Sequence, residues 1–345
     1  MLTRESFQFA RQTGATHIVA HLVDYFKDGG SENPRDNQPT GTERGWGVAG
    51  DPNKLWSEEE LKDLRRNVEA NGLKLEAIEN FDPAHWYDVL LDGPKKKQHL
   101  ENCKTIIRNL GAAGIPVMGY NFSIAGVCGR THMPYARGNA MSVGMEGPLD
   151  TPMPLGMAWN MVVDEHAPKG LVPSSTHEQL WKRLEDFLDA VLPVAEKSGV
   201  KLALHPDDPP LPFMRGQPRL VYQPALYQRV LDLHSSPSNA LEFCLGSLAE
   251  MTEGDIYETV DRYSSQQKLG YVHFRNITGK VPFYRETFID DGDIDMLRVL
   301  RILKRNNYDG VLIPDHTPQM SCSAPWHAGM AFAMGYMKAA LSALE

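Results

Sequence analysis

The chain has 345 residues, of which 42% are hydrophobic and 23% are charged, and its formal net charge is −9 with a pI of about 5.8. These values are typical of a globular protein with a sizeable core, and the acidic balance without a Lys/Arg block argues against nucleic acid as a partner. The sequence contains neither a signal peptide nor a stretch approaching the ~20 apolar residues of a membrane span. The four cysteines are widely spaced without a Cys-x-x-Cys pair, so we expect a cytoplasmic protein without disulfides.

The first third of the chain alternates apolar segments with amphipathic ones, which predicts strands followed by helices. The expected strands are 16–22, 73–78 and 115–122, and the expected helices are 57–70 and 95–113. Ser57 and Glu60 have the spacing of a capping box at the start of the first helix. Gly72 and Gly114 are placed to end the two helices.

Two stretches interrupt this pattern. Residues 27–55 are rich in Gly, Asn and Pro, and residues 123–174 are rich in Gly, Pro and Met without a sustained period. A structureless stretch of this length inside a compact domain is usually a lid or a binding loop. We therefore expect one (β/α) domain over 1–345, with both stretches as long loops at its active site.

After an expected helix over 177–198, four apolar segments each end in a potential metal ligand. They are 200–205 (VKLALH), 241–244 (LEFC), 269–273 (LGYVH) and 310–315 (GVLIPD), and their last residues are His205, Cys244, His273 and Asp315. Continuous apolar runs are typical of parallel strands covered on both faces. The carboxyl ends of such strands converge at the active-site mouth of a (β/α) barrel. The sequence therefore predicts an α/β fold, a TIM-type barrel, with a metal site at its mouth.

Seven strands can be counted in this way, whereas a closed barrel of this type has eight. We expect that an irregular segment closes the gap or that the barrel is incomplete at its amino-terminal strand.

The four candidate ligands also have ordinary explanations, since a lone Cys244 is more often a buried small hydrophobe. Four independent structural roles at successive strand ends would nevertheless be a coincidence. Imidazole and carboxylate suit Mn, Fe or Zn, while a thiolate favours Fe or Zn. Asp207 and Asp208 follow His205 in a rigid Pro-rich turn, and we expect their side chains to orient the imidazole through its second nitrogen.

Other polar residues near strand ends suit a chelating hydroxy acid or sugar. Candidates for hydroxyl groups are His21, Glu79, Asn80 and Asn121, and candidates for a carboxylate are Arg130 and Arg275. His316 follows Asp315 directly and is a candidate proton carrier. His327 lies in the last helical region and is a second candidate.

With these residues the chain resembles D-mannonate dehydratase, a metal-dependent barrel enzyme of hexuronate catabolism related to the xylose-isomerase-like barrels. The most specific matches are residues 205–210 (HPDDPP) and 292–296 (GDIDM). Weaker matches along most of the chain are 14–16, 55–57, 120–122, 130–131, Cys244 with 246–247, 273–275, 290–291 and 314–316.

The resemblance implies a ligand set, a reaction and an assembly. The residues matching His205, Cys244, His273 and Asp315 would hold Mn(II) or Fe(II). The reaction would remove water from a six-carbon aldonate to give a 2-keto-3-deoxy acid, with a base taking the proton beside the carboxylate and an acid assisting loss of the neighbouring hydroxyl. Relatives in this superfamily are often dimers or tetramers, so a homo-oligomer is expected.

The chain departs from the family at three places. The family has an additional strand ahead of the first one here, and a helical insertion where this chain has residues 123–174. It also has a Pro-Gly-Tyr motif whose Tyr looks like a proton-transfer residue, whereas this chain has Pro325-Trp326-His327. A Trp supplies no proton at neutral pH, so His316, His327 or a metal-bound water would have to. Two alternatives therefore stay open: a metal-dependent sugar isomerase or epimerase, and a non-catalytic sugar-acid-binding relative.

Overall fold

The computed structural model describes residues 2–27, 40 and 44–344, and its centre is a seven-stranded sheet. Neighbours follow the order β1-β2-β3-β8-β11-β12-β15, and every neighbouring pair is parallel. The strands are β1 (His17–His21), β2 (Lys74–Glu79), β3 (Val117–Tyr120), β8 (Lys201–Leu204), β11 (Asn239–Cys244), β12 (Leu269–His273) and β15 (Val311–Ile313). They lie where strands are predicted, and the α/β barrel is confirmed.

The barrel is incomplete, because β1 and β15 form the two ends of the sheet. Within the described residues, β1 pairs with β2 and β15 pairs with β12, and no strand lies between β15 and β1. Val19, Val311 and Ile313 are accordingly only half-buried. Of the two expected outcomes, the described residues therefore show the incomplete barrel, in which no strand pairing joins β1 to β15.

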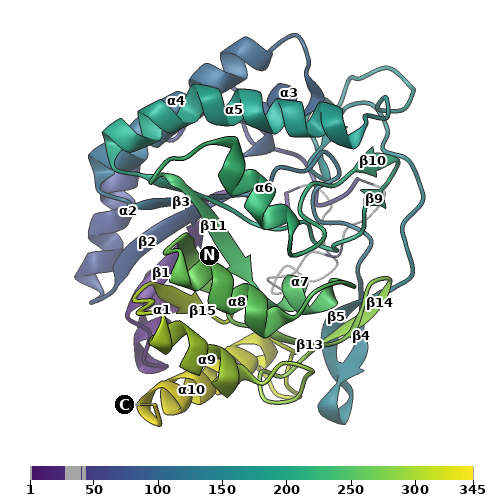
Figure 1. Ribbon diagram of the computed structural model, residues 1–345. Helices are drawn as coiled ribbons and strands as arrows, with labels where there is room; N and C mark the ends of the chain where they lie inside the picture. Colours follow the sequence, from purple (N-terminus) through teal and green to yellow (C-terminus); the bar gives the residue numbers. More distant parts are fainter. Residues whose placement is uncertain (1, 28–39, 41–43, 345) are drawn as a thin grey trace.

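Helices cover the outside of the sheet (Figure 1). They are α1 (Arg4–Gln12), α2 (Glu58–Ala70), α4 (Lys96–Ala113), α5 (His177–Ser198), α6 (Leu226–Leu233), α8 (Ile256–Ser265), α9 (Met296–Arg305) and α10 (Pro325–Ser342), with the short helices α3 (Pro83–Leu91) and α7 (Leu245–Glu250) near strand ends. Ser57 and Glu60 form the predicted capping box of α2, and Gly114 ends α4 with φ 72°. The local helix signals in the sequence are therefore confirmed.

A second sheet lies beside the barrel, at the lower right of Figure 1. Its antiparallel strands follow the order β13-β14-β5-β4 and are β4 (Thr131–Ala136), β5 (Ala140–Glu146), β13 (Asn276–Lys280) and β14 (Phe283–Thr287). The expectation that residues 123–174 lack regular structure was therefore wrong for β4 and β5. The partner strand β14 is distant in the sequence, so a local pattern does not reveal this pairing. Residues 28–39 and 41–43 of the other long stretch lie outside the described residues.

Four two-residue strands form two further antiparallel pairs outside the main sheets. These are β6 (Met157–Ala158) with β7 (Met161–Val162), and β9 (Phe213–Met214) with β10 (Gln217–Pro218). None of the described helices has the length and apolar character needed to span a bilayer.

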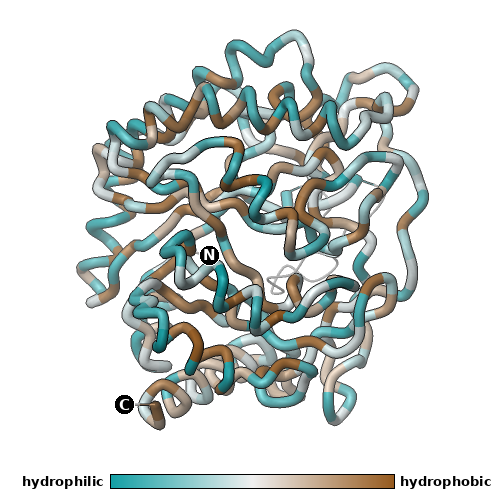
Figure 2. Tube along the Cα trace, in the orientation of Figure 1, coloured by the Kyte–Doolittle hydropathy of each residue, from teal (hydrophilic) through white to brown (hydrophobic). Residues whose placement is uncertain are grey.

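A small cluster of buried side chains lies inside the barrel. Ala77, Val117, Ala203 and Tyr271 form one interior cluster, while a larger core lies between the sheet and its helices. Figure 2 shows hydrophobic segments along the central strands and alternating character along the peripheral helices. Polar groups are therefore concentrated above this interior cluster, near the carboxyl ends of the strands.

Candidate metal centre

The four predicted ligands meet at the carboxyl end of the barrel. Cys244 and His273 are the last residues of β11 and β12 and are partners in the parallel register. The ligand atoms of His205, Cys244 and His273 all lie within 4.8 Å of one another. Oδ2 of Asp315 lies 3.3 Å from Nδ1 of His273. The structure thus brings three of the four residues into one cluster and places the fourth against it.

The turn after His205 orients this imidazole through its backbone. Nδ1 of His205 donates a hydrogen bond of 2.7 Å to the carbonyl of Pro206, which leaves Nε2 with its lone pair. The expected role of Asp207 and Asp208 in this orientation was wrong. Asp207 instead accepts hydrogen bonds from the backbone of 220 and 221 and pairs with Arg219, whose Nε lies 3.0 Å from Oδ1.

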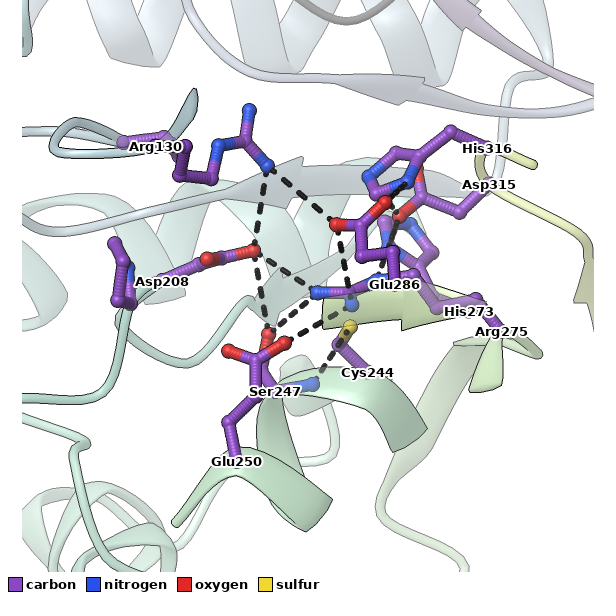
Figure 3. Close-up of polar contacts among 12 residues, drawn as sticks. Arg130, Asp208, Cys244, Ser247, Glu250, His273, Arg275, Glu286, Asp315 and His316 are labelled. Carbon is purple, nitrogen blue, oxygen red and sulfur yellow. Dashed lines mark hydrogen bonds and ion pairs between the residues drawn. The ribbon is translucent and has the colours of Figure 1, made fainter. Parts of the chain in front are cut away.

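Asp208 belongs to a buried network of charges around Arg275 (Figure 3). Nη2 of Arg275 lies 3.0 Å from Oδ2 of Asp208, and Nη1 lies 3.0 Å from Oε1 of Glu250. The guanidinium is 3% exposed. The Arg275 guanidinium was a candidate for binding a substrate carboxylate. It is already paired with carboxylates of the protein.

Arg130 is less tightly paired than Arg275. Its Nη1 lies 3.8 Å from Oδ2 of Asp208 and 4.0 Å from Oε1 of Glu286, and its guanidinium lies 5.8 Å from the ring centroid of Trp46. These separations exceed hydrogen-bond length. Arg130 is consequently the better placed of the two arginines to donate to a bound anion.

Charge around the cluster favours the deprotonated, metal-ligating form of Cys244. Burial alone raises the pKa of the Cys244 thiol, but the positive charge of Arg275 and contacts with His205 and His273 outweigh it and hold the pKa well below its ordinary value. A thiolate is the ligating form of cysteine. In addition, Asp315 adopts φ 61°, a left-handed conformation uncommon outside glycine, and such backbone outliers concentrate at functional sites.

One buried polar atom of the cluster supports a cation here. Nδ1 of His273 has no hydrogen-bond partner among the described residues. The site also gathers carboxylates beside its guanidinium and imidazole groups, namely Glu79, Asp208, Glu242, Glu250, Glu286 and Asp315. A buried polar atom without a partner is costly unless a partner such as a cation binds. The donor set of imidazole, thiolate and carboxylate therefore fits a divalent transition-metal ion.

His316 is held beside this cluster by two carboxylates. Its Nε2 lies 2.9 Å from Oδ2 of Asp315, and its Nδ1 contacts Glu286 of β14. Glu286 and Glu242 are absent from the sequence-predicted site. For Glu242 the sequence does contain a signal, namely a carboxylate flanked by apolar residues inside an expected buried strand (Leu241-Glu242-Phe243).

The remaining candidates occupy different parts of the molecule. The His21 side chain is 40% exposed, and its Nδ1 and the Asn80 amide both contact the Tyr25 hydroxyl at 3.1 Å. The Asn121 amide is buried and donates to the carbonyl of Pro206. The His327 ring packs against Phe9 and Trp326 at the start of α10, with centroid separations of 4.7 and 5.0 Å.

The chain is similar to a family of known proteins over most of its length. A family model described as D-mannonate dehydratase (UxuA) matches residues 7–145 and 172–340. Mannonate dehydratase of Streptococcus equi subsp. zooepidemicus is 33% identical over 276 residues, covering 76% of this chain and 75% of that protein. Mannonate dehydratase 2 of Halalkalibacterium halodurans is 30% identical over 275 residues, covering 76% of this chain and 79% of its own length.

Solved structures are also similar to this chain. The crystal structure of mannonate dehydratase from Streptococcus suis serotype 2 superimposes with a TM-score of 0.71 at 27% identity, over 95% of this chain and 94% of the other. An L-ribulose 3-epimerase superimposes with a TM-score of 0.56 at 14% identity, over 99% and 91% of the two chains. The latter likeness concerns the barrel fold alone.

Proposed function

Because this chain belongs to the D-mannonate dehydratase family, we propose that it removes water from D-mannonate or a closely related aldonate, giving a 2-keto-3-deoxy acid. Its activity class is that of a sugar-acid hydro-lyase. The observation that carries this proposal is the cluster of His205, Cys244 and His273 within 4.8 Å at the barrel mouth, with Asp315 beside it.

We assign His205, Cys244, His273 and Asp315 as the ligands of a divalent ion, with Mn(II) or Fe(II) expected. Bound there, such an ion would act as a Lewis acid on the oxygens of a chelating substrate. Cys244 and His273 end two paired strands of the sheet, so their donor atoms are fixed by the backbone. His205 is fixed by its hydrogen bond to Pro206.

His316 is our candidate for the proton donor to the leaving hydroxyl. Burial alone lowers the pKa of His316, but the carboxylates of Asp315 and Glu286 outweigh it and raise the pKa to about 9. The imidazole is therefore cationic near neutral pH and suited to act as an acid. His327 is the weaker candidate, since its ring packs against Phe9 and Trp326.

We propose that Arg130 binds the substrate carboxylate and that His21 and Asn80 bind hydroxyl groups. Arg130 has only long contacts with Asp208 and Glu286, whereas Arg275 is saturated by carboxylates. Arg275 then neutralises the buried charges of Asp208 and Glu250 beside the proposed ligands. Asn121 acts indirectly, by holding the Pro206 carbonyl that orients His205.

The activity is tested by incubating the Mn(II)-loaded protein with a panel of aldonates. A 2-keto-3-deoxy product from at least one aldonate is the expected result. Solvent deuterium entering the recovered substrate without dehydration would instead identify an epimerase, the alternative that Trp326 keeps open. Binding without exchange or turnover would identify a non-catalytic sugar-acid-binding protein.

We further propose a cytoplasmic homo-oligomer, a dimer or a tetramer, acting on this small-molecule sugar acid. Light scattering coupled to size-exclusion chromatography measures the mass of the assembly directly. A monomer at micromolar concentration would contradict this part of the proposal.

A further inference from the structure

We propose that Glu79 and Glu242 are positioning residues that fix the ring of His273, so that its Nδ1 faces the other metal ligands. The inference rests on the ligand set proposed above. Nε2 of His273 lies 3.2 Å from Oε2 of Glu79, to which it donates a hydrogen bond, and 2.9 Å from Oε1 of Glu242. Nδ1 lies on the other side of the ring, 3.3 Å from Oδ2 of Asp315.

Glu242 lies one layer deeper in the barrel than the ligands. It precedes Cys244 by two positions on β11, and it is paired in register with Tyr271, just as Cys244 is paired with His273. Side chains two residues apart point to the same face of a strand and are separated by about 6.6 Å. The ring of His273 therefore lies between two layers of side chains. The proposed ligands lie toward the carboxyl ends of the strands, and Glu79 and Glu242 lie deeper in the barrel.

The carboxylates define which nitrogen of His273 carries the proton. A neutral imidazole has one N–H donor and one lone pair, and an ionised carboxylate only accepts. Two carboxylates at Nε2 place the N–H there and leave the lone pair on Nδ1. Histidines that ligate metals commonly donate their second nitrogen to a carboxylate, which fixes the ring and raises the basicity of the ligand atom.

The buried surroundings of Glu242 place its carboxylate against His273. Glu242 is 0% exposed and Glu79 is 6% exposed, so neither carboxylate faces solvent. Oε1 of Glu242 contacts Nε2 of His273, and the Tyr271 hydroxyl contacts both Glu242 and Glu79. A Cβ on Gly119 of β3 would lie 2.1 Å from the Tyr271 hydroxyl and 2.6 Å from Oε2 of Glu242. Glycine at this position thus leaves the space that the carboxylate layer occupies.

A competing interpretation makes the two carboxylates ligands themselves. Ligand atoms of Glu79, Glu242 and His273 also lie within 4.8 Å of one another. An ion there would need the lone pair of Nε2, while an ion shared with Asp315 needs the lone pair of Nδ1, which lies 3.3 Å from Oδ2 of Asp315. A neutral imidazole offers only one of the two, so the geometry favours a single ion at the upper layer.

The test compares Glu79→Gln, Glu242→Gln and the double variant with wild-type protein. Mn(II) affinity is measured by equilibrium dialysis with elemental analysis, and the ligand field by the absorption spectrum of the Co(II)-loaded protein. We expect one ion per wild-type chain, an affinity loss of roughly 10- to 100-fold in the double variant, and a changed Co(II) spectrum. Asp88→Asn is the matched control, because Asp88 is similarly buried but lies on α3, where its carboxylate accepts from the backbone of Lys95. It should keep the wild-type affinity and spectrum.

Wild-type affinity and spectrum in the double variant would overturn the inference. Two ions per wild-type chain, falling to one in the double variant, would overturn it by making the carboxylates ligands. Cys244→Ser separates this inference from the proposed function. If Cys244→Ser binds metal like wild type, the proposed ligand set is wrong. If Cys244→Ser loses metal but the double variant keeps the wild-type affinity, only the positioning role of Glu79 and Glu242 is wrong.

A measurement on the wild-type protein keeps the inference testable if the variants fold poorly. Nitrogen-15 NMR of labelled histidines in the Zn(II)-loaded chain reports which ring nitrogen is protonated. For His273 we expect the proton on Nε2 and the ion on Nδ1. The reverse assignment would overturn the inference.

Discussion

Oε2 of Glu286 lies 2.7 Å from Nδ1 of His316. Glu286 belongs to β14 of the second sheet, while His316 follows β15 of the barrel. The second sheet therefore contributes directly to the mouth of the barrel through this contact. His316 is held from its other nitrogen by Asp315, so both ring nitrogens face carboxylates.

Glu286→Gln should lower the pKa of His316, because it removes one of the two charges that raise this pKa to about 9. The cationic form of His316 then disappears at lower pH, and the alkaline limb of the pH–rate profile moves to lower pH. NMR titration of the metal-free protein and a kcat profile measure these shifts. Glu146→Gln, an exposed change on the neighbouring strand β5, is the control. An unmoved alkaline limb in Glu286→Gln would contradict the role of Glu286.

His316→Asn should reduce kcat by about 10²- to 10⁴-fold, the usual contribution of a general acid. The bound metal should remain, because the four proposed ligands are intact. Elemental analysis alongside steady-state kinetics checks both outcomes. Turnover that survives in His316→Asn but is lost in His327→Ala would move the proton donor to His327.

Cys244→Ser and His273→Ala should each lose most of the bound metal while keeping the circular-dichroism spectrum of the wild type. Each change removes a donor from the cluster of Figure 3. Cys103→Ser is a matched control, because Cys103 is equally buried but lies on α4. Full metal content in Cys244→Ser or in His273→Ala would exclude that residue as a ligand.

Arg219→Met should destabilise the chain by about 3–5 kcal/mol, because removing Arg219 leaves the buried charge of Asp207 unpaired. Arg219 is 0% exposed and also donates to the carbonyls of Gly126, Asp208 and Pro209. Urea unfolding monitored by fluorescence measures the loss. The exposed pair of Arg229 and Glu178 provides the control, and Arg229→Met should leave the unfolding midpoint nearly unchanged.

The amides of β15 should exchange with solvent deuterium faster than those of β11. Strand β11 is paired on both sides, by β8 and β12, whereas β15 is paired with β12 alone among the described strands. Local opening therefore breaks fewer contacts at β15. Mass-spectrometric hydrogen exchange of peptides covering 239–244 and 311–313 makes the comparison. Equal protection of the two peptides would contradict the one-sided pairing of β15.

The barrel and the cluster of proposed ligands were predictable because local patterns in the sequence indicate them. Each central strand is a continuous apolar run, and each of His205, Cys244 and His273 stands at the end of one. Asp315 follows the same rule two residues beyond β15.

The surroundings of the ligands were harder to predict, because they depend on pairings between distant segments. Glu286 reaches His316 only because β14 pairs with β5 in a separate sheet. Asp207 was expected to orient His205, but its partner Arg219 approaches from the turn that follows. Which partner such a polar side chain pairs with depends on charge and tertiary contacts, and the periodicity of the strands does not reveal it.

The unequal pairing of the strands gives the proposed ligands unequal support. Cys244 and His273 end strands that have a neighbour on each side, while Asp315 follows β15, which is paired with β12 alone among the described strands. If the barrel moves when a molecule binds, we therefore expect the carboxylate of Asp315 to shift more readily than the sulfur and nitrogen donors.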